Sequence, residues 1–262
     1  MKVTDSIFRV IDTETTHIDP LRAKVCEIGL CDVFKNSDTL WERSRGYASL
    51  CNPGEPIPPE AKAVHHILDY DVRDRAPAKT IIDGIALPHS QPERLVFVAH
   101  NAAYDRPVLE AAGFPTGRRW LCTWRLALHV WPRAPSYKNE VLRYWLGYDS
   151  LPWETPGGPP AQTHRAGHDV QVTALILGHA LSELEERIAA NDDVDKLIAW
   201  AESPVLLIGP MGFGKHEAKT WEECAAADPG YFAWMMRQNE ADWDRDKWHT
   251  AKHYHRVSRG LT

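Results

Sequence analysis

The sequence lacks long apolar runs, a signal-peptide pattern and internal repeats. No apolar run approaches the roughly 18 residues that a membrane-spanning helix needs, which predicts no membrane span. The start, MKVTDSIFRVIDTETT, does not resemble a signal peptide, because Arg9 and Asp12 interrupt its short apolar run. No heptad pattern indicates a coiled coil, and the oligomeric state stays open. These absences favour a cytoplasmic globular protein.

Cysteines are few, and their spacing excludes two kinds of site. The five residues are odd in number and form no C-x-x-C pair, which predicts reduced thiols rather than a disulfide framework or a zinc knuckle. They are Cys26, Cys31, Cys51, Cys122 and Cys224.

An excess of positive charge is also absent, because 36 Asp and Glu outnumber 30 Lys and Arg, for a net charge of −6. The chain is therefore not basic throughout, as a non-specific nucleic-acid-binding protein would be. Positive charge is instead local. Residues 118–143 contain six Lys or Arg and one Glu, and residues 245–262 contain five and one Asp. Either stretch is a candidate phosphate-facing patch, with a solvated helix face as the alternative.

The remaining pattern predicts a mixed α/β fold, in a chain whose 44% hydrophobic and 25% charged residues are ordinary for a globular protein. Apolar, β-branched runs predict strands at 6–16, 24–34, 41–50 and 93–101. Helical spacing predicts helices at 102–113, 123–131, 139–147 and 164–190, with a Pro/Gly-rich loop at 148–163. Composition changes at 202–204, after which we expect one short apolar strand and three helical segments. We predict two domains, a large one at 1–190 and a small, mainly helical one at 191–262.

One glycine-rich stretch has the spacing of a phosphate-binding loop. PVLLIGPMGFGKHE, at 204–217, contains G-x-x-x-x-G-K from Gly209 to Lys215. His216 stands where such a loop needs a Ser or Thr hydroxyl for magnesium. The 46 residues that follow are too few for the parallel βαβ core that the loop would serve. We therefore predict that this stretch is not a nucleotide-triphosphate site.

Acidic residues follow three of the predicted elements. Asp12 and Glu14 end the first strand, and a spacing of two places both side chains on one face. Two such carboxylates repel each other unless a cation or hydrogen bonds neutralise them. Asp105 lies in the first turn of a helix, and Asp169 follows His164 by five residues at the start of the longest helix. Taken singly, each has a structural alternative: a polar strand end, a carboxylate at a helix dipole, or a histidine at a helix start.

Together the segments DTE, HNAAYD and HRAGHD resemble, in order and interval, the motifs of the DEDDh 3′→5′ exonucleases of the ribonuclease H-like superfamily. This resemblance covers about residues 6–180 and implies a mixed five-stranded sheet flanked by helices. Within that group the chain is similar to the exodeoxyribonuclease X family, through PPEAKAVHHI, WLCTWRLALHVWP, YKNEVL and the tail segments FGKHEAK and DPGYFAW. Two positions, His17 and Ala218, depart from the glycine that the family usually has there.

The resemblance implies hydrolysis at the 3′ ends of DNA, single-stranded or duplex, with release of 5′-mononucleotides. It implies two Mg²⁺ or Mn²⁺ ions, whose ligands would be Asp12, Glu14, Asp105 and Asp169. His164 would be the general base that takes a proton from the attacking water. The positions that match the family's terminal-nucleotide pocket are Thr13, Thr15, His65, Ile67, Asn101 and Tyr104.

Three alternatives stay open at this point: an RNA-trimming 3′→5′ exoribonuclease, a catalytically silent nucleic-acid-binding module and a polymerase-bound proofreading subunit. Discrimination between DNA and RNA depends on contacts near the ribose 2′ position, which the sequence does not reveal. The complete set of five catalytic residues argues against the silent module. In the tail, we expect Lys215 and its loop to contact DNA phosphates. The tail aromatics form either a stacking platform for single strands or a small core: Trp221, Tyr231, Trp234, Trp243 and Trp248.

Overall fold

The fold is built on one mixed β-sheet. The computed structural model of the chain describes residues 1–36, 40–87, 89–151 and 164–260. The strands are β1 (Ile7–Thr15), β2 (Val25–Lys35), β3 (Trp41–Arg43), β4 (Tyr47–Leu50), β5 (Leu95–Ala99) and β6 (Trp120–Cys122). Seven of the nine residues of β1 are buried, among them the apolar residues Ile7, Phe8, Val10 and Ile11, so this strand runs through the centre of the sheet.

The strand order is β3-β2-β1-β5-β6, with β4 also paired to β2. β1 runs antiparallel to β2 and parallel to β5, and β5 runs parallel to β6. β3 pairs with Val33–Lys35 of β2, and β4 pairs with Glu27–Leu30 of the same strand. The two short strands therefore share one edge position, so the predicted five-stranded mixed sheet is confirmed, with the segment 41–50 divided between two strands.

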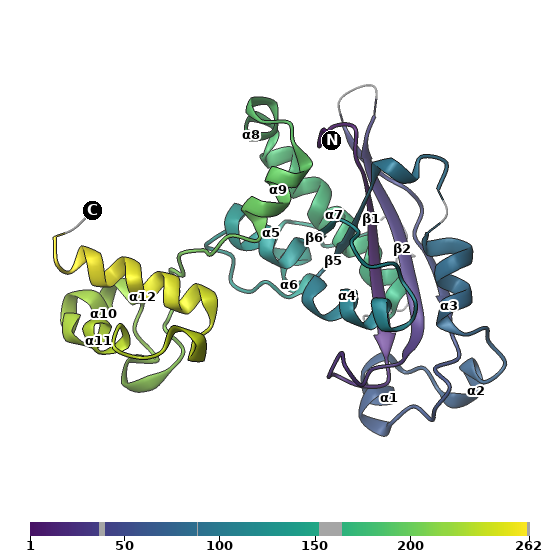
Figure 1. Cartoon of the computed structure of the whole chain (residues 1–262), viewed down its shortest axis with the longest axis horizontal. Helices are drawn as coiled ribbons and strands as arrows, with labels where there is room; N and C mark the ends of the chain where they lie inside the picture. Colours follow the sequence, from purple (N-terminus) through teal and green to yellow (C-terminus); the bar gives the residue numbers. More distant parts are fainter. Residues whose placement is uncertain (37–39, 88, 152–163, 261–262) are drawn as a thin grey trace. The chain divides into compact units, whose positions relative to one another are not determined.

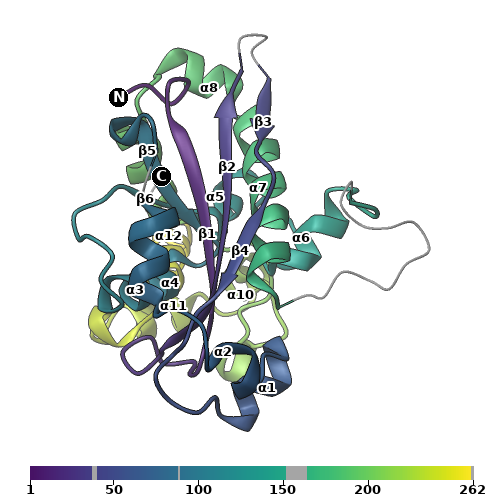
Figure 2. The same ribbon diagram turned by 90° about the vertical axis from the view of Figure 1, so that its right-hand side faces the viewer.

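Helices cover both faces of the sheet. Figures 1 and 2 show α7 (Ala166–Glu183) along one face, with α3 (Ala78–Ile81) and α4 (Ala102–Ala111) on the other. The remaining helices of this part are α1 (Pro59–His65), α2 (Asp69–Val72), α5 (Thr123–Val130), α6 (Asn139–Trp145), α8 (Glu185–Ala190) and α9 (Val194–Ala201). Within the described residues, no helix combines the length and apolarity needed to cross a membrane. All five cysteines lie in the described part of the chain, are buried and form no disulfide.

The chain divides into two compact units. The first comprises Met1–Val130 and Pro135–Ala201, and the second comprises Trp131–Ala134 and Glu202–Thr262. The first unit thus includes α9, which lies beyond residue 190. Independent folding of domains at 1–190 and 191–262 stays a prediction.

The second unit has a helical core. Its helices are α10 (Trp221–Ala227), α11 (Pro229–Met235) and α12 (Arg245–Val257). Trp221, Tyr231 and Trp248 are buried, whereas Trp234 is 41% exposed. These three buried side chains therefore belong to a small core and are not available as a platform on which single-stranded bases could stack.

The short strand expected after Pro204 is absent from residues 205–210, all of which the structure describes. The reason is that backbone N–H groups of this extended segment donate hydrogen bonds to side chains rather than to a neighbouring strand. The Val205 N–H donates to the Asp246 carboxylate at 3.0 Å, and the Leu207 N–H donates to the Thr250 hydroxyl at 2.9 Å. Side chains of α12 thus take the place of a neighbouring strand.

The glycine-rich stretch at 204–217 also lacks the architecture of a phosphate-binding loop. No strand precedes it, and Gly214–His216 form a single 3₁₀ turn rather than the start of a long helix. Lys215 pairs with Asp228 at 2.7 Å. Ala218 and His17 are not among the described non-glycine residues with positive φ, so neither position requires the glycine that the family usually has.

Candidate active site

Three carboxylates from two distant segments meet on one face of the sheet. Asp12 and Glu14 project from the same face of β1, and Asp169 lies in the first turn of α7, which packs on that face. One carboxylate oxygen from each of the three residues lies within 4.8 Å of the other two. The predicted grouping of Asp12, Glu14 and Asp169 is therefore present in the structure.

A glycine lets α7 approach the sheet closely enough to form this group. Gly29 of β2 lies opposite Asp12 in the antiparallel register. A Cβ atom at Gly29 would lie 2.2 Å from the carbonyl oxygen of Ala166, the first residue of α7. The absence of a side chain at residue 29 is thus what allows the start of α7, and Asp169 with it, to reach the end of β1.

An ion pair with a buried carboxylate fixes the same helix start. Glu27 lies opposite Glu14 in the register and is 3% exposed. Its carboxylate accepts two hydrogen bonds from the Arg165 guanidinium, at 2.7 and 3.0 Å, and a third from the Ala166 N–H at 2.9 Å. Bidentate pairs of this kind fix orientation as well as position. Sequence reasoning missed Glu27 and Arg165, and the only signal for Glu27 is a charged residue inside an apolar strand.

Asp105 approaches from the other side of β1. It lies in the first turn of α4, is 4% exposed, and accepts a hydrogen bond from the Thr13 hydroxyl at 2.8 Å. Thr13 faces away from Asp12 and Glu14, because alternate residues of a strand point to opposite faces. Asp105 still adds to the negative field at Asp12, where it contributes to a raised pKa.

All four carboxylates bind protons more tightly than usual. Burial raises the pKa of Glu14 to about 8. It raises the pKa values of Asp105 and Asp169 to about 7, although hydrogen bonds from Thr13 oppose the shift at Asp105. The pKa of Asp12 is well above its ordinary value, first through burial and then through the negative charges of Asp169 and Asp105. The cluster therefore resists full ionisation unless a positive charge enters it.

The donor set fits a divalent cation with a preference for oxygen ligands. Arg165 lowers the pKa of Glu14, but its guanidinium is bound to Glu27. Carboxylates with oxygens this close and with raised pKa values match the hard ligands of Mg²⁺ and Mn²⁺, whereas zinc prefers nitrogen and sulfur.

A second acidic group lies next to the first and is explained without a metal. Glu140, His168 and Asp169 also bring their ligand atoms within 4.8 Å of one another. Here Glu140 accepts a hydrogen bond from His168 at 2.9 Å and one from Arg143 at 3.1 Å. Burial alone would raise the pKa of Glu140, but these two partners lower it below its ordinary value. Its charge is already compensated by protein groups.

Gly29→Ala tests whether the close approach of α7 to β2 forms the carboxylate cluster. Because the new methyl group meets backbone atoms of Ala166, the helix start must move outward, at a cost of about 1–3 kcal/mol. Thermal melts with and without Mn²⁺ should show a lower melting temperature and a smaller stabilisation by the metal. Gly84→Ala is the matched control, since nothing lies within 4 Å of a Cβ there. Equal melting temperatures and equal metal shifts in the two variants would contradict the account.

His164 lies just before α7, with an exposed side chain and a left-handed backbone, φ 59°. A hydrogen bond from its backbone lowers the pKa of Asp169, which burial otherwise raises. The predicted position at the helix start is thus observed, and the following residue is the Arg165 that binds Glu27. The structure brings the His164 backbone to the cluster, and the catalytic role of its imidazole stays a prediction.

Four of the six predicted pocket residues line one cavity of about 540 Å³: Thr13, Thr15, His65 and Tyr104. Glu14 lines the same cavity, which therefore opens beside the carboxylate cluster. The Tyr104 hydroxyl donates to the His17 carbonyl oxygen and also bonds the Thr15 hydroxyl. These hydrogen bonds fix the polar side of the cavity. Ile18, whose side chain is exposed, and Val64 add apolar surface that sequence reasoning did not single out.

The other two residues lie elsewhere. Ile67 is 2% exposed and packs with Cys26, Ile57 and Val72 in a core cluster. Asn101 caps α4 with φ 80° and lines a different cavity, of about 480 Å³, with Trp124 and Tyr137. Substrate binding by any of the six stays a prediction.

Comparison with known proteins identifies the family. The exonuclease family model (RNase_T) matches residues 10–177. The chain belongs to this exonuclease family. It is 29% identical over 231 residues to Exodeoxyribonuclease 10 of Escherichia coli K12, across 88% of this chain and 90% of that protein. It is 30% identical over 185 residues to a DNA polymerase III subunit epsilon-like protein of Rhodobacter capsulatus, across 69% of this chain and 24% of that protein.

Solved structures agree with this assignment. Exonuclease X in complex with 5′ overhanging duplex DNA superposes with a TM-score of 0.54 at 26% identity, covering 74% of this chain and 99% of that one. Exonuclease I of E. coli in complex with a dT13 oligonucleotide has a TM-score of 0.52 at 14% identity, over 78% of this chain and 47% of that one, and shares the fold. The resemblance to DEDDh exonucleases found in the sequence is confirmed.

Proposed function

We propose that the protein is a metal-dependent 3′→5′ exodeoxyribonuclease that releases 5′-mononucleotides from the 3′ ends of DNA. The observation that carries the proposal is the cluster of Asp12, Glu14 and Asp169, whose close carboxylates and raised pKa values support the binding of a cation. The likeness to Exodeoxyribonuclease 10 across most of both chains supports DNA as the substrate.

Asp12, Glu14 and Asp169 would hold one Mg²⁺ or Mn²⁺ ion, and Asp12 would also bind a second. Asp105 would join directly or through water, in the orientation that Thr13 gives its carboxylate. Two such ions, when bound, activate water and stabilise charge on the transferring phosphoryl group. The residues themselves supply the negative charge and the fixed positions, and the Glu27–Arg165 pair keeps Asp169 in place.

His164 would act as general base for the attacking water. An imidazole exchanges protons near neutral pH, and this one is solvent-exposed beside the cluster. Because the His164 backbone bonds Asp169 and Arg165 bonds Glu27, the segment that carries the imidazole is held on both sides.

His164→Asn is expected to lower kcat by about 10²–10³-fold, because asparagine tolerates positive φ but cannot accept the proton. KM for DNA and the stabilisation by Mn²⁺ should change little. His66→Asn is the matched control, an exposed histidine with φ 58°. Retention of wild-type kcat in His164→Asn would remove His164 from the mechanism.

The cavity beside Glu14 would take the terminal nucleotide. Ile18 and Val64 offer apolar surface to a base, and the Thr15–Tyr104 pair offers hydroxyls to the sugar. A pocket of this kind favours a chain end over an internal site, because the nucleotide must enter it to bring its phosphate to the carboxylates.

A 5′-labelled single-stranded DNA oligonucleotide tests the proposed function, with Mg²⁺ or Mn²⁺, with EDTA, and with an RNA strand of matched sequence. We expect a ladder that shortens from the 3′ end of DNA only when metal is present. Faster loss of RNA would instead assign an RNA-trimming exoribonuclease. Binding of both strands without degradation would assign a silent nucleic-acid-binding module.

A further inference from the structure

A second cavity, of about 480 Å³, opens where β5 and β6 end. His100 and Asn101 follow β5, Trp124 lies in the first turn of α5 directly after β6, and loop residues 135–138 complete the lining. This volume falls within the roughly 300–1,000 Å³ that small-molecule sites occupy. The site proposed above for the terminal nucleotide does not include this cavity.

The second cavity adjoins the carboxylate cluster on two sides. β5 is the parallel neighbour of β1, so both strands end at the same edge of the sheet. Asn139, which follows Lys138, donates from its side-chain amide to the Asp169 carbonyl oxygen at 3.2 Å. The loop that lines the cavity is thereby joined to the first turn of α7.

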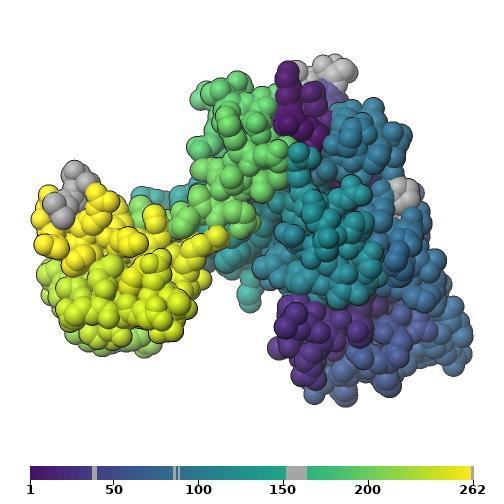
Figure 3. All heavy atoms as spheres, viewed as in Figure 1, coloured from purple at the N-terminus to yellow at the C-terminus, as the bar shows by residue number. Residues whose placement is uncertain are grey.

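Helix α4 connects the two cavities. Its N-cap residue Asn101 lines the second one, and Tyr104, three residues further on, lines the cavity proposed for the terminal nucleotide. Figure 3 shows the teal spheres of α4 directly above the purple spheres of the loop after β1, whose Ile18 lines that first cavity. A strand that ends in the first cavity and crosses the carboxylates therefore has the second cavity next along its path.

Two polar side chains in the second cavity are available to a ligand. Asn101 is the N-cap residue of α4, but its side chain makes no capping hydrogen bond. Of the basic residues in 118–143, Arg119 and Arg143 pair with carboxylates, whereas Lys138 lines the cavity. Among the described residues, neither the Asn101 amide nor the Lys138 ammonium forms a hydrogen bond or ion pair, and no carboxylate lines the cavity.

A histidine fixes the shape of the cavity. Nε2 of His100 lies 2.7 Å from the Tyr137 carbonyl oxygen, and Nδ1 lies 2.9 Å from the Thr123 hydroxyl. Because a carbonyl oxygen only accepts, Nε2 carries the proton and Nδ1 accepts from Thr123. Loss of hydration lowers the pKa of His100 to about 4, so the ring is neutral near pH 7 and keeps this arrangement. The loop that carries Lys138 is thus tied to the end of β5.

We propose that this cavity binds the penultimate nucleotide of the DNA strand, on the 5′ side of the scissile phosphate. Lys138 pairs with the phosphate on the 5′ side of that nucleotide, and the Asn101 amide donates to its phosphate or sugar oxygens. The half-buried Trp124, which packs against the core, offers its ring to the base. This inference rests on the proposed function, since it takes the strand held at the carboxylates as the ligand.

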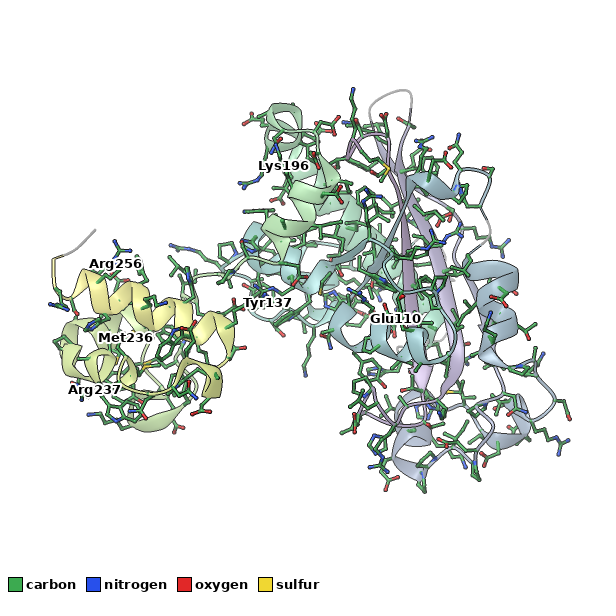
Figure 4. The ribbon with its side chains drawn as sticks, in the orientation of Figure 1. Glu110, Tyr137, Lys196, Met236, Arg237 and Arg256 are labelled. Atoms are coloured by element: carbon green, nitrogen blue, oxygen red, sulfur yellow. The ribbon has the colours of Figure 1, made fainter. Side chains whose placement is uncertain are left out.

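Thymidine dinucleotides with and without a 5′-phosphate test the inference, because they are too short to reach beyond the two cavities. For the full-length wild type, Lys138→Gln and Lys196→Gln, kcat/KM is measured for loss of each dinucleotide with Mn²⁺. Lys196 is an exposed lysine of α9 in the same unit, so this control loses the same charge outside the cavity. Figure 4 shows it well apart from Tyr137, which belongs to the loop that lines the cavity.

In the wild type, the 5′-phosphate should raise kcat/KM about tenfold, as expected for one hydrogen bond to a charged group. Lys138→Gln should reduce this ratio to less than about twofold, whereas Lys138→Arg and the control should keep it, because both retain a cation at residue 138. Rates are divided by those for the p-nitrophenyl ester of thymidine 5′-phosphate, which has no penultimate nucleotide. This division corrects for any change in the fold or at the carboxylates.

Trp124→Leu tests the base contact separately. It should lower kcat/KM for both dinucleotides, relative to the ester, by on the order of tenfold, and leave the ratio due to the 5′-phosphate unchanged. Trp124→Phe, which keeps an aromatic ring, should restore most of the loss.

A wild type without preference for the 5′-phosphate, an unchanged preference in Lys138→Gln, or an equal loss in Lys196→Gln overturns the inference. If the wild type hydrolysed neither the ester nor the dinucleotides, the proposed function would fail instead. Titration calorimetry of the two dinucleotides in EDTA would then decide, by the same ratio in affinity, whether the cavity binds a nucleotide.

Discussion

Asp12→Asn is expected to lower kcat for DNA degradation by on the order of 10³-fold or more. The substitution keeps the volume of the side chain but removes a carboxylate that has an oxygen within 4.8 Å of Glu14 and of Asp169. Without it, the site loses a ligand of both proposed ions. Initial rates on a 5′-labelled single-stranded oligonucleotide with Mn²⁺ measure the effect.

Asp83→Asn is the control for this substitution, because it makes the same chemical change on an exposed residue that pairs with Lys79. We expect wild-type rates from it. If Asp12→Asn kept more than a tenth of the wild-type rate, the carboxylate cluster would not be the catalytic centre.

The metal-free protein is expected to lose stability as pH rises from about 4 to about 8, and divalent ions are expected to restore it. The folded-state pKa values of Glu14, Asp105 and Asp169, at about 8, 7 and 7, lie above their ordinary values of 4.5, 3.8 and 3.8. In that window the folded state holds more protons than the unfolded state, so its stability falls with pH. Mutual coupling limits the total loss, which we place on the order of 2–4 kcal/mol.

Thermal melts of the wild-type protein and of Asp12→Asn at pH 5 and pH 8 measure this effect. The difference between the two melting temperatures at each pH removes the contribution of titrating groups outside the cluster, which both proteins share. Without metal, the variant should melt higher than the wild type at pH 8 by roughly 4–10 °C, and by less at pH 5. Mn²⁺ should raise the wild-type melting temperature more at pH 8 than at pH 5, because binding requires ionised carboxylates. A wild-type protein whose stability relative to the variant rises with pH would contradict the raised pKa values.

The parts of the site that the sequence predicted are those that depend on short-range periodicity. Asp12 and Glu14 share a face because a strand alternates, and Asp169 lies in a first helical turn because the apolar repeat begins there. The β-branched and apolar residues of β1 and the five apolar residues of β5 likewise mark the centre of the sheet. β6 escaped prediction because three residues are too few to show a period of two.

The parts that could not be predicted depend on contacts between distant segments. The pairing of Glu27 with Arg165 spans 138 residues and follows from the register of β1 against β2, which no local pattern encodes. The packing of Ile67 with Cys26, Ile57 and Val72 likewise joins segments that are far apart in the sequence. The segment at 205–208 is as apolar as a strand, but its donors bind side chains of α12. Tertiary context decided each of these outcomes.

Anomalous X-ray scattering from crystals soaked in Mn²⁺ tests the central claim most directly, because two acidic groups in this protein share Asp169. We predict a strong manganese peak among the carboxylates of Asp12, Glu14 and Asp169, and its loss in Asp12→Asn. A peak at Glu140 and His168 with none beside Asp12 would contradict the assignment of the catalytic centre.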